Sequence, residues 1–126
     1  MANKPMIIDS SVWIAYFDTN DSQHTSAKQT LETRTTAVII PEYILLEVVT
    51  VLRNKKKESV LKQFIDLATK RGTYLAADTL GVEVAACYSQ KQYQKLSFVD
   101  VALVLLSKQY EIITFDKALT EVINQS

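Results

Sequence analysis

The hydrophobic residues of this chain fall into two alternating kinds of segment. Short runs of consecutive apolar residues, without polar alternation, are typical of strands buried on both faces of a sheet. Longer segments between them place apolar residues three and four positions apart, which is the spacing of an amphipathic helix. The short runs lie at residues 6–8, 36–40, 74–76 and 112–115, and the helical segments lie at 10–17, 21–32, 41–53, 58–70, 80–93, 97–109 and from 116 onward.

Strands that alternate with helices indicate an α/β fold with a parallel sheet. We therefore expect a three-layer α/β/α sandwich, with a central parallel sheet of four or five strands and helices on both of its faces. Residues 1–126 are expected to form a single domain, because this length can bury a core of its own but is short for two domains. Ligands of such sheets bind outside the carboxyl ends of the strands, so a functional site is expected there.

Composition narrows the class of protein. Fourteen basic and fourteen acidic residues give a formal net charge of zero, which argues against a protein that coats nucleic acid without sequence preference. The single cysteine excludes an internal disulfide framework. We see neither a secretory leader nor an apolar run long enough to cross a membrane, so we expect a cytoplasmic protein without membrane partners.

Four acidic residues lie where an acid is unusual. Asp9 and Asp116 directly follow two of the apolar runs, and Glu47 and Asp100 are each the only charged residue of a largely apolar helical stretch. A buried carboxylate is costly unless it is paired, protonated or bound to a metal ion. Each of these acids therefore needs an explanation.

A plain structural explanation exists for each of them. Asp9 and Asp116 stand where an aspartate often caps the following helix. Asp100 and Ser97, three residues earlier, resemble a capping box. Glu47 lies at the edge of an apolar helical arc, from which its carboxylate can reach solvent. Helix capping does not require the four acids to lie near one another, whereas a shared functional site does. The relative positions of the four acids therefore distinguish the two explanations.

If the fold brings these acids together, their mutual repulsion raises their pKa values. A bound divalent cation relieves that repulsion, and a ligand set of oxygens alone favours Mg²⁺ or Mn²⁺ over Zn²⁺. Such a cation can activate water or hold a phosphate, which suits the hydrolysis of phosphodiesters. The spacing of the acids alone leaves open whether they meet.

The sequence around these acids resembles the PIN domain, a family of small metal-dependent ribonucleases that includes the VapC toxins of toxin–antitoxin pairs. The resemblance runs from Ile7 to about Leu119. It is carried by four motifs in the family's order: IIDSSV, PEYILLEV, LSFVDVAL and TFD, which begin at Ile7, Pro41, Leu96 and Thr114.

This resemblance implies a metal-dependent endoribonuclease that hydrolyses RNA phosphodiester bonds with metal-activated water, as the toxin of a toxin–antitoxin pair. Its expected partners are RNA, a cognate antitoxin protein and a second copy in a homodimer. Four acids would be catalytic and hold Mg²⁺ or Mn²⁺, and two hydroxyl residues would support them by hydrogen bonds. The acids are Asp9, Glu47, Asp100 and Asp116, and the supporting residues are Ser10 and Thr114.

Other features of the chain bear on the same expectation. Many family members carry a further acid or an asparagine shortly after the last aspartate, but here Lys117, Ala118 and Leu119 follow it. Many also end on a fifth strand, which is missing or very short here. The basic run Lys55-Lys56-Lys57 is a candidate contact for the RNA backbone, with an ordinary solvated loop as the alternative.

Two rival functions remain open from the sequence. One is a PIN-like scaffold that binds RNA or protein and has lost its activity. The other is a signalling or phosphatase domain in which Asp9 accepts a phosphoryl group. Phosphatases of the haloacid dehalogenase type need a second aspartate two positions later, where this chain has Ser11. The four acids therefore favour the nuclease.

Overall fold

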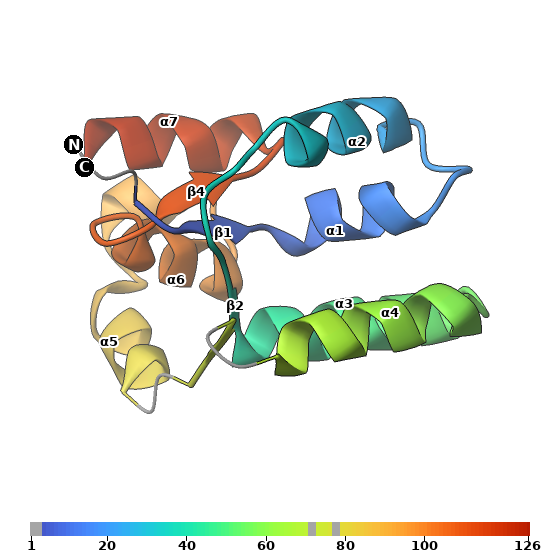
Figure 1. The fold of residues 1–126 in the computed structure, drawn as a ribbon. Helices are drawn as coiled ribbons and strands as arrows, with labels where there is room; N and C mark the ends of the chain where they lie inside the picture. The colour runs from blue at the N-terminus through green and yellow to red at the C-terminus, as the bar shows by residue number, and fades with distance from the viewer. Residues whose placement is uncertain (1–3, 71–72, 77–78) are drawn as a thin grey trace.

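The computed structural model describes residues 4–70, 73–76 and 79–126. Within these residues, four strands form one sheet in the order β3-β2-β1-β4. All three pairings between neighbouring strands are parallel, as the sequence predicts. The strands are β1 (Met6–Ile8), β2 (Val38–Pro41), β3 (Tyr74–Leu75) and β4 (Glu111–Ile113) (Figure 1).

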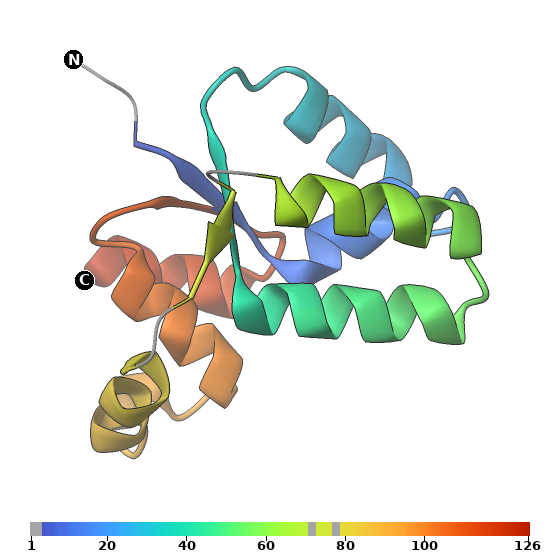
Figure 2. The same ribbon diagram turned by 60° about the horizontal axis from the view of Figure 1, so that its bottom comes forward.

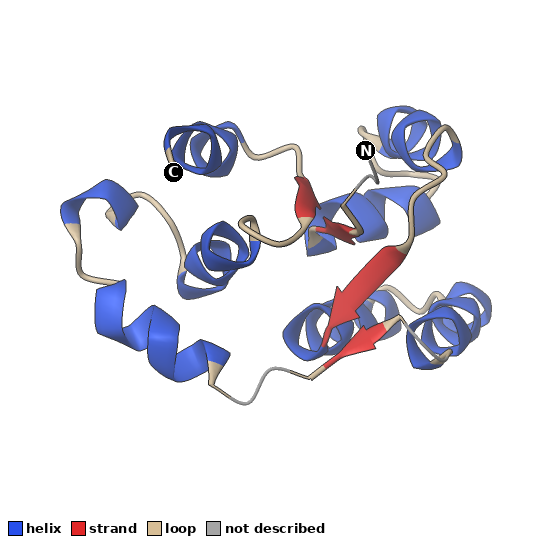
Figure 3. Ribbon diagram, turned by 60° about the vertical axis from the view of Figure 1, so that its left-hand side comes forward, coloured by secondary structure: helices blue, strands red, loops and turns tan. Residues whose placement is uncertain are grey.

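Helices cover both faces of the sheet, so the predicted three-layer sandwich is confirmed. The first four helices lie on one face of the sheet and the last three on the other (Figure 3). The apolar side chains of each group form a separate cluster of the core. On the first face, α3 and α4 pack side by side as a long hairpin (Figure 2). The helices are α1 (Ser10–Phe17), α2 (His24–Glu32), α3 (Glu42–Asn54), α4 (Glu58–Thr69), α5 (Leu80–Cys87), α6 (Phe98–Leu106) and α7 (Lys117–Gln125).

The central strand β1 contributes to both halves of the core. Met6 and Ile8 belong to the apolar cluster beneath α1–α4, whereas Ile7 belongs to the cluster beneath α5–α7. All three side chains are at most 2% exposed. This burial on both faces explains why the run is apolar without alternation. It also fixes the register of the strand, because a slip of one residue would exchange the two faces.

Three helices differ from their predicted bounds by three residues or more. The prediction of one continuous helix over 80–93 is wrong, since α5 ends at Cys87 and a short 3₁₀ helix follows at Lys91–Tyr93. The backbone of Gln90 is extended between them (φ −65°, ψ 146°) and so ends helical geometry. The helix predicted at 97–109 ends at Leu106.

The helix predicted from residue 21 begins at His24 instead. Two aspartates in the preceding loop accept bonds from backbone N–H groups two residues later, at 3.0 Å for Asp18 and 2.8 Å for Asp21. Such turns compete locally with helix formation.

No helix in the described part of the chain is long and apolar enough to cross a membrane.

Candidate active site

Three of the four predicted acids line one hollow at the carboxyl edge of the sheet. Asp9 directly follows β1, Asp116 lies shortly after β4, and Asp100 lies in the first turn of α6. The hollow has a volume of about 350 Å³, and its other lining residues are Ser10, Ser11, Gln23 and Phe115. We refer to this hollow as the acid hollow, and to Asp9, Glu47, Asp100 and Asp116 together as the acid cluster.

Asp9 is the most buried member of the acid cluster, with only 7% of its surface exposed. Its side chain makes no capping hydrogen bond to α1, so the plain capping explanation is wrong for this residue. Burial raises the pKa of Asp9, and the nearby charge of Asp100 raises it further, whereas the hydrogen bond from Thr114 lowers it. Asp9 is therefore a buried acid whose charge the protein compensates only in part.

Thr114 links two acids of the hollow through its hydroxyl group. The hydroxyl donates a hydrogen bond of 2.8 Å to Oδ2 of Asp9 and accepts one of 3.1 Å from the backbone N–H of Asp116. The strand predicted at 112–115 ends at Ile113, so Thr114 lies just beyond β4. The predicted support of the acids by Thr114 thus has a clear geometric basis.

Asp100 and Asp116 cap helices and also face the acid hollow. Asp100 completes a capping box, in which its Oδ2 accepts from the backbone N–H of Ser97 at 3.2 Å. Asp116 accepts from the backbone N–H of Leu119 at 3.1 Å through Oδ1. In each case the bond to the cap involves one carboxylate oxygen. Capping and a place at the site are therefore compatible for these two residues.

Glu47 does not line the acid hollow, yet it belongs to the same electrostatic group. Partial burial raises the pKa of Glu47, and the charges of Asp9 and Asp100 raise it further. The nearby Ser10 hydroxyl opposes this rise in the pKa of Glu47. The Ser11 hydroxyl donates a hydrogen bond of 3.4 Å to Oδ2 of Asp9. Among the described residues, the serine whose hydroxyl donates a hydrogen bond to an acid of the cluster is therefore Ser11.

Tyr43 is a neighbour of the acid cluster that the sequence analysis did not single out. Burial raises the pKa of its phenol, and the charges of Asp9, Glu47 and Asp100 raise it further. Tyr43 lies in α3 four residues before Glu47, hence on the same face of the helix. That spacing is the signal from which its position could have been found.

Two lysines of the basic run Lys55-Lys56-Lys57 form ion pairs with a buried acid, Asp18, which was not among the predicted site residues. Asp18 is only 4% exposed, and its carboxylate pairs with Nζ of Lys55 at 2.9 Å and with Nζ of Lys57 at 3.7 Å. The hydrogen bond from Lys55 is the main reason why the pKa of Asp18 is lowered. Two of the three lysines thus join the α3–α4 turn to the end of α1, and Lys56 has no ion pair within the described residues.

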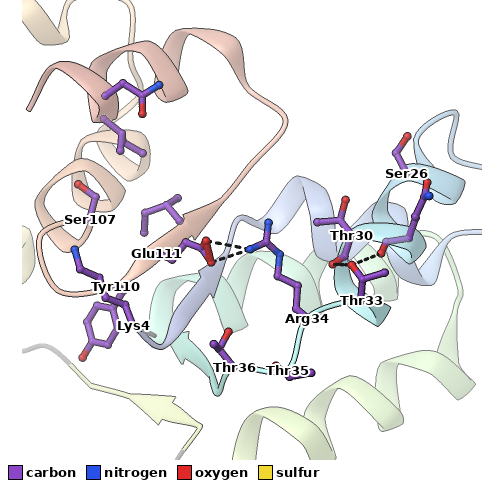
Figure 4. A pocket seen from close by; sticks show the side chains of 14 residues that line it. Lys4, Ser26, Thr30, Thr33, Arg34, Thr35, Thr36, Ser107, Tyr110 and Glu111 are labelled. Carbon is purple, nitrogen blue, oxygen red and sulfur yellow. Dashed lines mark hydrogen bonds and ion pairs between the residues drawn. The ribbon is translucent and has the colours of Figure 1, made fainter. Parts of the chain in front are cut away.

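A larger cavity, of about 1060 Å³, lies at the opposite edge of the sheet and contains none of the predicted acids. Figure 4 shows Arg34 reaching across it to Glu111, whose two carboxylate oxygens accept from Nη1 at 2.9 and 3.0 Å. Hydroxyl side chains from Ser26, Thr30 and Thr33 line the same cavity. Its lining carries no group of acids, so the acid hollow remains the better candidate for metal-dependent chemistry.

The residues of the acid hollow are of the type that binds a hard cation. They offer carboxylate oxygens from three separate elements, and Mg²⁺ is commonly held by one or two carboxylates while retaining several waters. Within the described ranges, no three Asp, Glu, His or Cys side chains converge closely enough to form a ready-made metal-binding group. A cation that has few direct protein ligands and keeps several waters therefore fits this hollow better than a cation enclosed entirely by protein ligands.

Comparison with known proteins identifies the family to which the chain belongs. A family model described as the PIN domain matches residues 6–124. Ribonuclease VapC26 of Mycobacterium tuberculosis is 26% identical over 119 residues, which cover 89% of this chain and 87% of the relative. The crystal structure of Mycobacterium tuberculosis VapC20, described as a Sarcin-Ricin loop cleaving toxin, has the same fold, with a TM-score of 0.76 at 16% identity over 92% of this chain and 93% of that chain. Because the family model spans nearly the whole chain, the protein belongs to the PIN domain family, and its relatives there are VapC proteins.

Proposed function

We propose that this protein is an endoribonuclease that depends on Mg²⁺ or Mn²⁺ and acts as the toxin of a toxin–antitoxin pair. The observation that carries the proposal is the acid hollow, where Asp9, Asp100 and Asp116 from three different elements line one space at the carboxyl edge of the sheet. Membership of the PIN family and likeness to a VapC ribonuclease support the choice of RNA as the substrate.

The protein's own residues prepare this hollow for a cation. Asp9 accepts a hydrogen bond from Thr114, and the nearby Ser10 hydroxyl opposes the rise in the pKa of Glu47, so the charges of both acids are partly compensated although they repel one another. A bound divalent cation would relieve that repulsion and would activate water for attack on an RNA phosphodiester. Asp100 and Asp116 each have one oxygen bonded to a helix cap, which fixes the direction of the carboxylate.

The lysine run is a proposed contact for the RNA backbone, and Lys56 carries most of that role. Lys55 and Lys57 are paired with Asp18, so their charges are partly compensated. Each phosphate contact makes the affinity for nucleic acid more dependent on salt. We expect Lys56→Ala to reduce the slope of RNA affinity against salt concentration, and an unchanged slope would remove Lys56 from the RNA-binding surface.

The proposed partners follow from the relationship to VapC proteins. A cognate antitoxin would cover the acid hollow, where an arginine could pair with the carboxylates. A second copy would form a homodimer, which sedimentation equilibrium of the purified protein would detect. The place of action would be the cytoplasm.

The proposal is tested by cleavage of an end-labelled structured RNA. The purified protein is assayed with Mg²⁺, with Mn²⁺ and with chelator, beside the variant Asp9→Asn. Asp66→Asn is the matched control, because Asp66 is an exposed acid on α4 that does not line the acid hollow. We expect cleavage by the wild type and by Asp66→Asn with metal, and none by Asp9→Asn or in chelator.

The other outcomes separate the alternatives. No cleavage of several RNAs by the wild type, in the absence of any copurifying inhibitor, would contradict the nuclease and favour a binding scaffold. Equal cleavage by the wild type and Asp9→Asn would point to a contaminating nuclease and would leave the acid cluster without its proposed role. Labelling of Asp9 by acetyl phosphate would instead support the phosphoryl acceptor.

A further inference from the structure

The hydroxyl group of Tyr43 is buried without a hydrogen-bond partner among the described residues. A phenol that loses water without gaining a protein partner destabilises the fold, so few such groups remain unexplained in folded proteins. The Trp13 ring nitrogen shares this property, but it lies within an aromatic cluster with Phe17 and Phe64. The Tyr43 hydroxyl, in contrast, lies within the influence of three charged acids.

Tyr43 lies within the influence of three acids of the cluster. It occupies the same face of α3 as Glu47, one turn earlier in the helix. Burial, together with the charges of Asp9, Glu47 and Asp100, raises the pKa of its phenol, which therefore keeps its proton. A neutral phenol is a hydrogen-bond donor, and a carboxylate is an acceptor. The donor and its natural acceptors are thus neighbours that are not yet bonded.

We propose that Tyr43 is a positioning residue of the acid cluster, whose hydroxyl donates a hydrogen bond to a cluster carboxylate when a divalent cation draws the acids together. This inference rests on the proposed metal dependence of the site. It assigns a role to a residue outside the predicted set of acids and hydroxyl residues. It also accounts for a buried hydroxyl that has no hydrogen-bond partner among the described residues.

The arrangement of the residues around Tyr43 makes this role specific. Its ring packs against both apolar clusters of the core, so it has little freedom to turn the hydroxyl into solvent. The hydroxyl donors that Asp9 already has, Thr114 and Ser11, both bond to its Oδ2. A further donor from α3 would restrain the cluster from the side of the core.

The test compares Tyr43→Phe with the wild type in two measurements. One is the dissociation constant for Mn²⁺, measured by isothermal titration calorimetry without RNA. The other is the free energy of unfolding by urea in chelator. The matched control is Tyr93→Phe, because Tyr93 is half-buried and lines a separate cavity that contains none of the acids.

In Tyr43→Phe we expect the dissociation constant for Mn²⁺ to rise about tenfold, the scale of one hydrogen bond to a charged group. The stability in chelator should stay equal or rise, because an unbonded buried hydroxyl is removed. Tyr93→Phe should leave the Mn²⁺ affinity unchanged.

An unchanged Mn²⁺ affinity in Tyr43→Phe, beside normal binding by the wild type, would overturn the role of Tyr43 and leave the proposed function intact. Lower stability of Tyr43→Phe in chelator would also overturn it, since the hydroxyl would then have a partner without metal. Failure of the wild type to bind Mn²⁺ would contradict the metal dependence itself, together with this inference.

Discussion

Replacement of Thr114 by valine tests how the protein tolerates a buried carboxylate at Asp9. The change keeps the shape of the side chain but removes the hydroxyl that donates to Asp9 at 2.8 Å. A hydrogen bond to a charged group contributes roughly 1.5–3 kcal/mol to stability. The N–H of Asp116 also loses its acceptor, but Asp116 is exposed and water can replace that bond. We therefore expect a loss of about 2 kcal/mol at pH 7, equivalent to a fall of roughly 8 °C in Tm for a chain of this length.

The loss of stability in Thr114→Val is expected to depend on pH. Thr114 lowers the pKa of Asp9, so its contribution to stability is present when Asp9 is ionised and is lost as the pH falls through the pKa of Asp9 in the folded protein. The difference in unfolding free energy between the wild type and Thr114→Val should therefore shrink on acidification. Urea denaturation in chelator, followed by circular dichroism across a range of pH, measures this difference.

Two controls make the Thr114 result interpretable. Thr69→Val makes the same substitution at an exposed helical position, where the hydroxyl bonds to the backbone carbonyls of Ile65 and Asp66 and to no charged group, and we expect a loss of less than about 0.5 kcal/mol. Thr114→Ser keeps the hydroxyl and should retain the dependence on pH seen in the wild type. A Thr114→Val protein as stable as the wild type at pH 7, or a loss that is the same at every pH, would refute the reasoning.

Four further variants test other parts of the structure. Asp9→Asn should raise the free energy of unfolding in chelator at pH 7, because burial raises the pKa of Asp9 and makes its charged form unfavourable in the folded protein. Urea titrations at several pH values would measure this gain. It should vanish near pH 4, where the carboxyl group becomes protonated in both states. Lys55→Met should lower the melting temperature at neutral pH, because the hydrogen bond from Lys55 is the main reason why the pKa of Asp18 is lowered. In acid, where Asp18 is protonated, the variant and the wild type should melt alike. Thermal unfolding at neutral and at acidic pH would measure both. Phe64→Ala, at a fully buried position, should cost about 3–5 kcal/mol by urea denaturation. Arg34→Gln should cost less than about 1 kcal/mol in the same assay, because its ion pair is exposed.

The order and type of the elements followed from the sequence because hydrophobic periodicity and burial agree here. The run at 6–8 is apolar without alternation, and its side chains do face two different halves of the core. The limits of the helices were less predictable. Gln90 ends α-helical geometry within a polar stretch that carries no proline or glycine, so nothing in the local sequence marked the break at 88–90.

Asp9 and Asp116 stood out because they directly follow apolar runs, and Glu47 and Asp100 because each is the only charged residue of a largely apolar stretch. Their supporting contacts were less predictable, since these depend on side-chain directions in the folded protein. Ser10 was expected to support the acids, but the hydrogen bond from a serine hydroxyl to Asp9 comes from Ser11. Asp18 was missed because an aspartate at the end of a helix is common, and its partner Lys55 lies 37 positions later in the sequence.

The hydrogen bond between Thr114 and Asp9 joins residues 105 positions apart. A protein is synthesised from its amino terminus at roughly 5–20 residues per second. β1 is therefore made before its neighbour β4 and has no complete place in the sheet until β4 follows. In the interval the growing chain carries Asp9 without Asp116. If the protein is a nuclease, the order of its strands delays assembly of the acid hollow until β4 and Asp116 have been made.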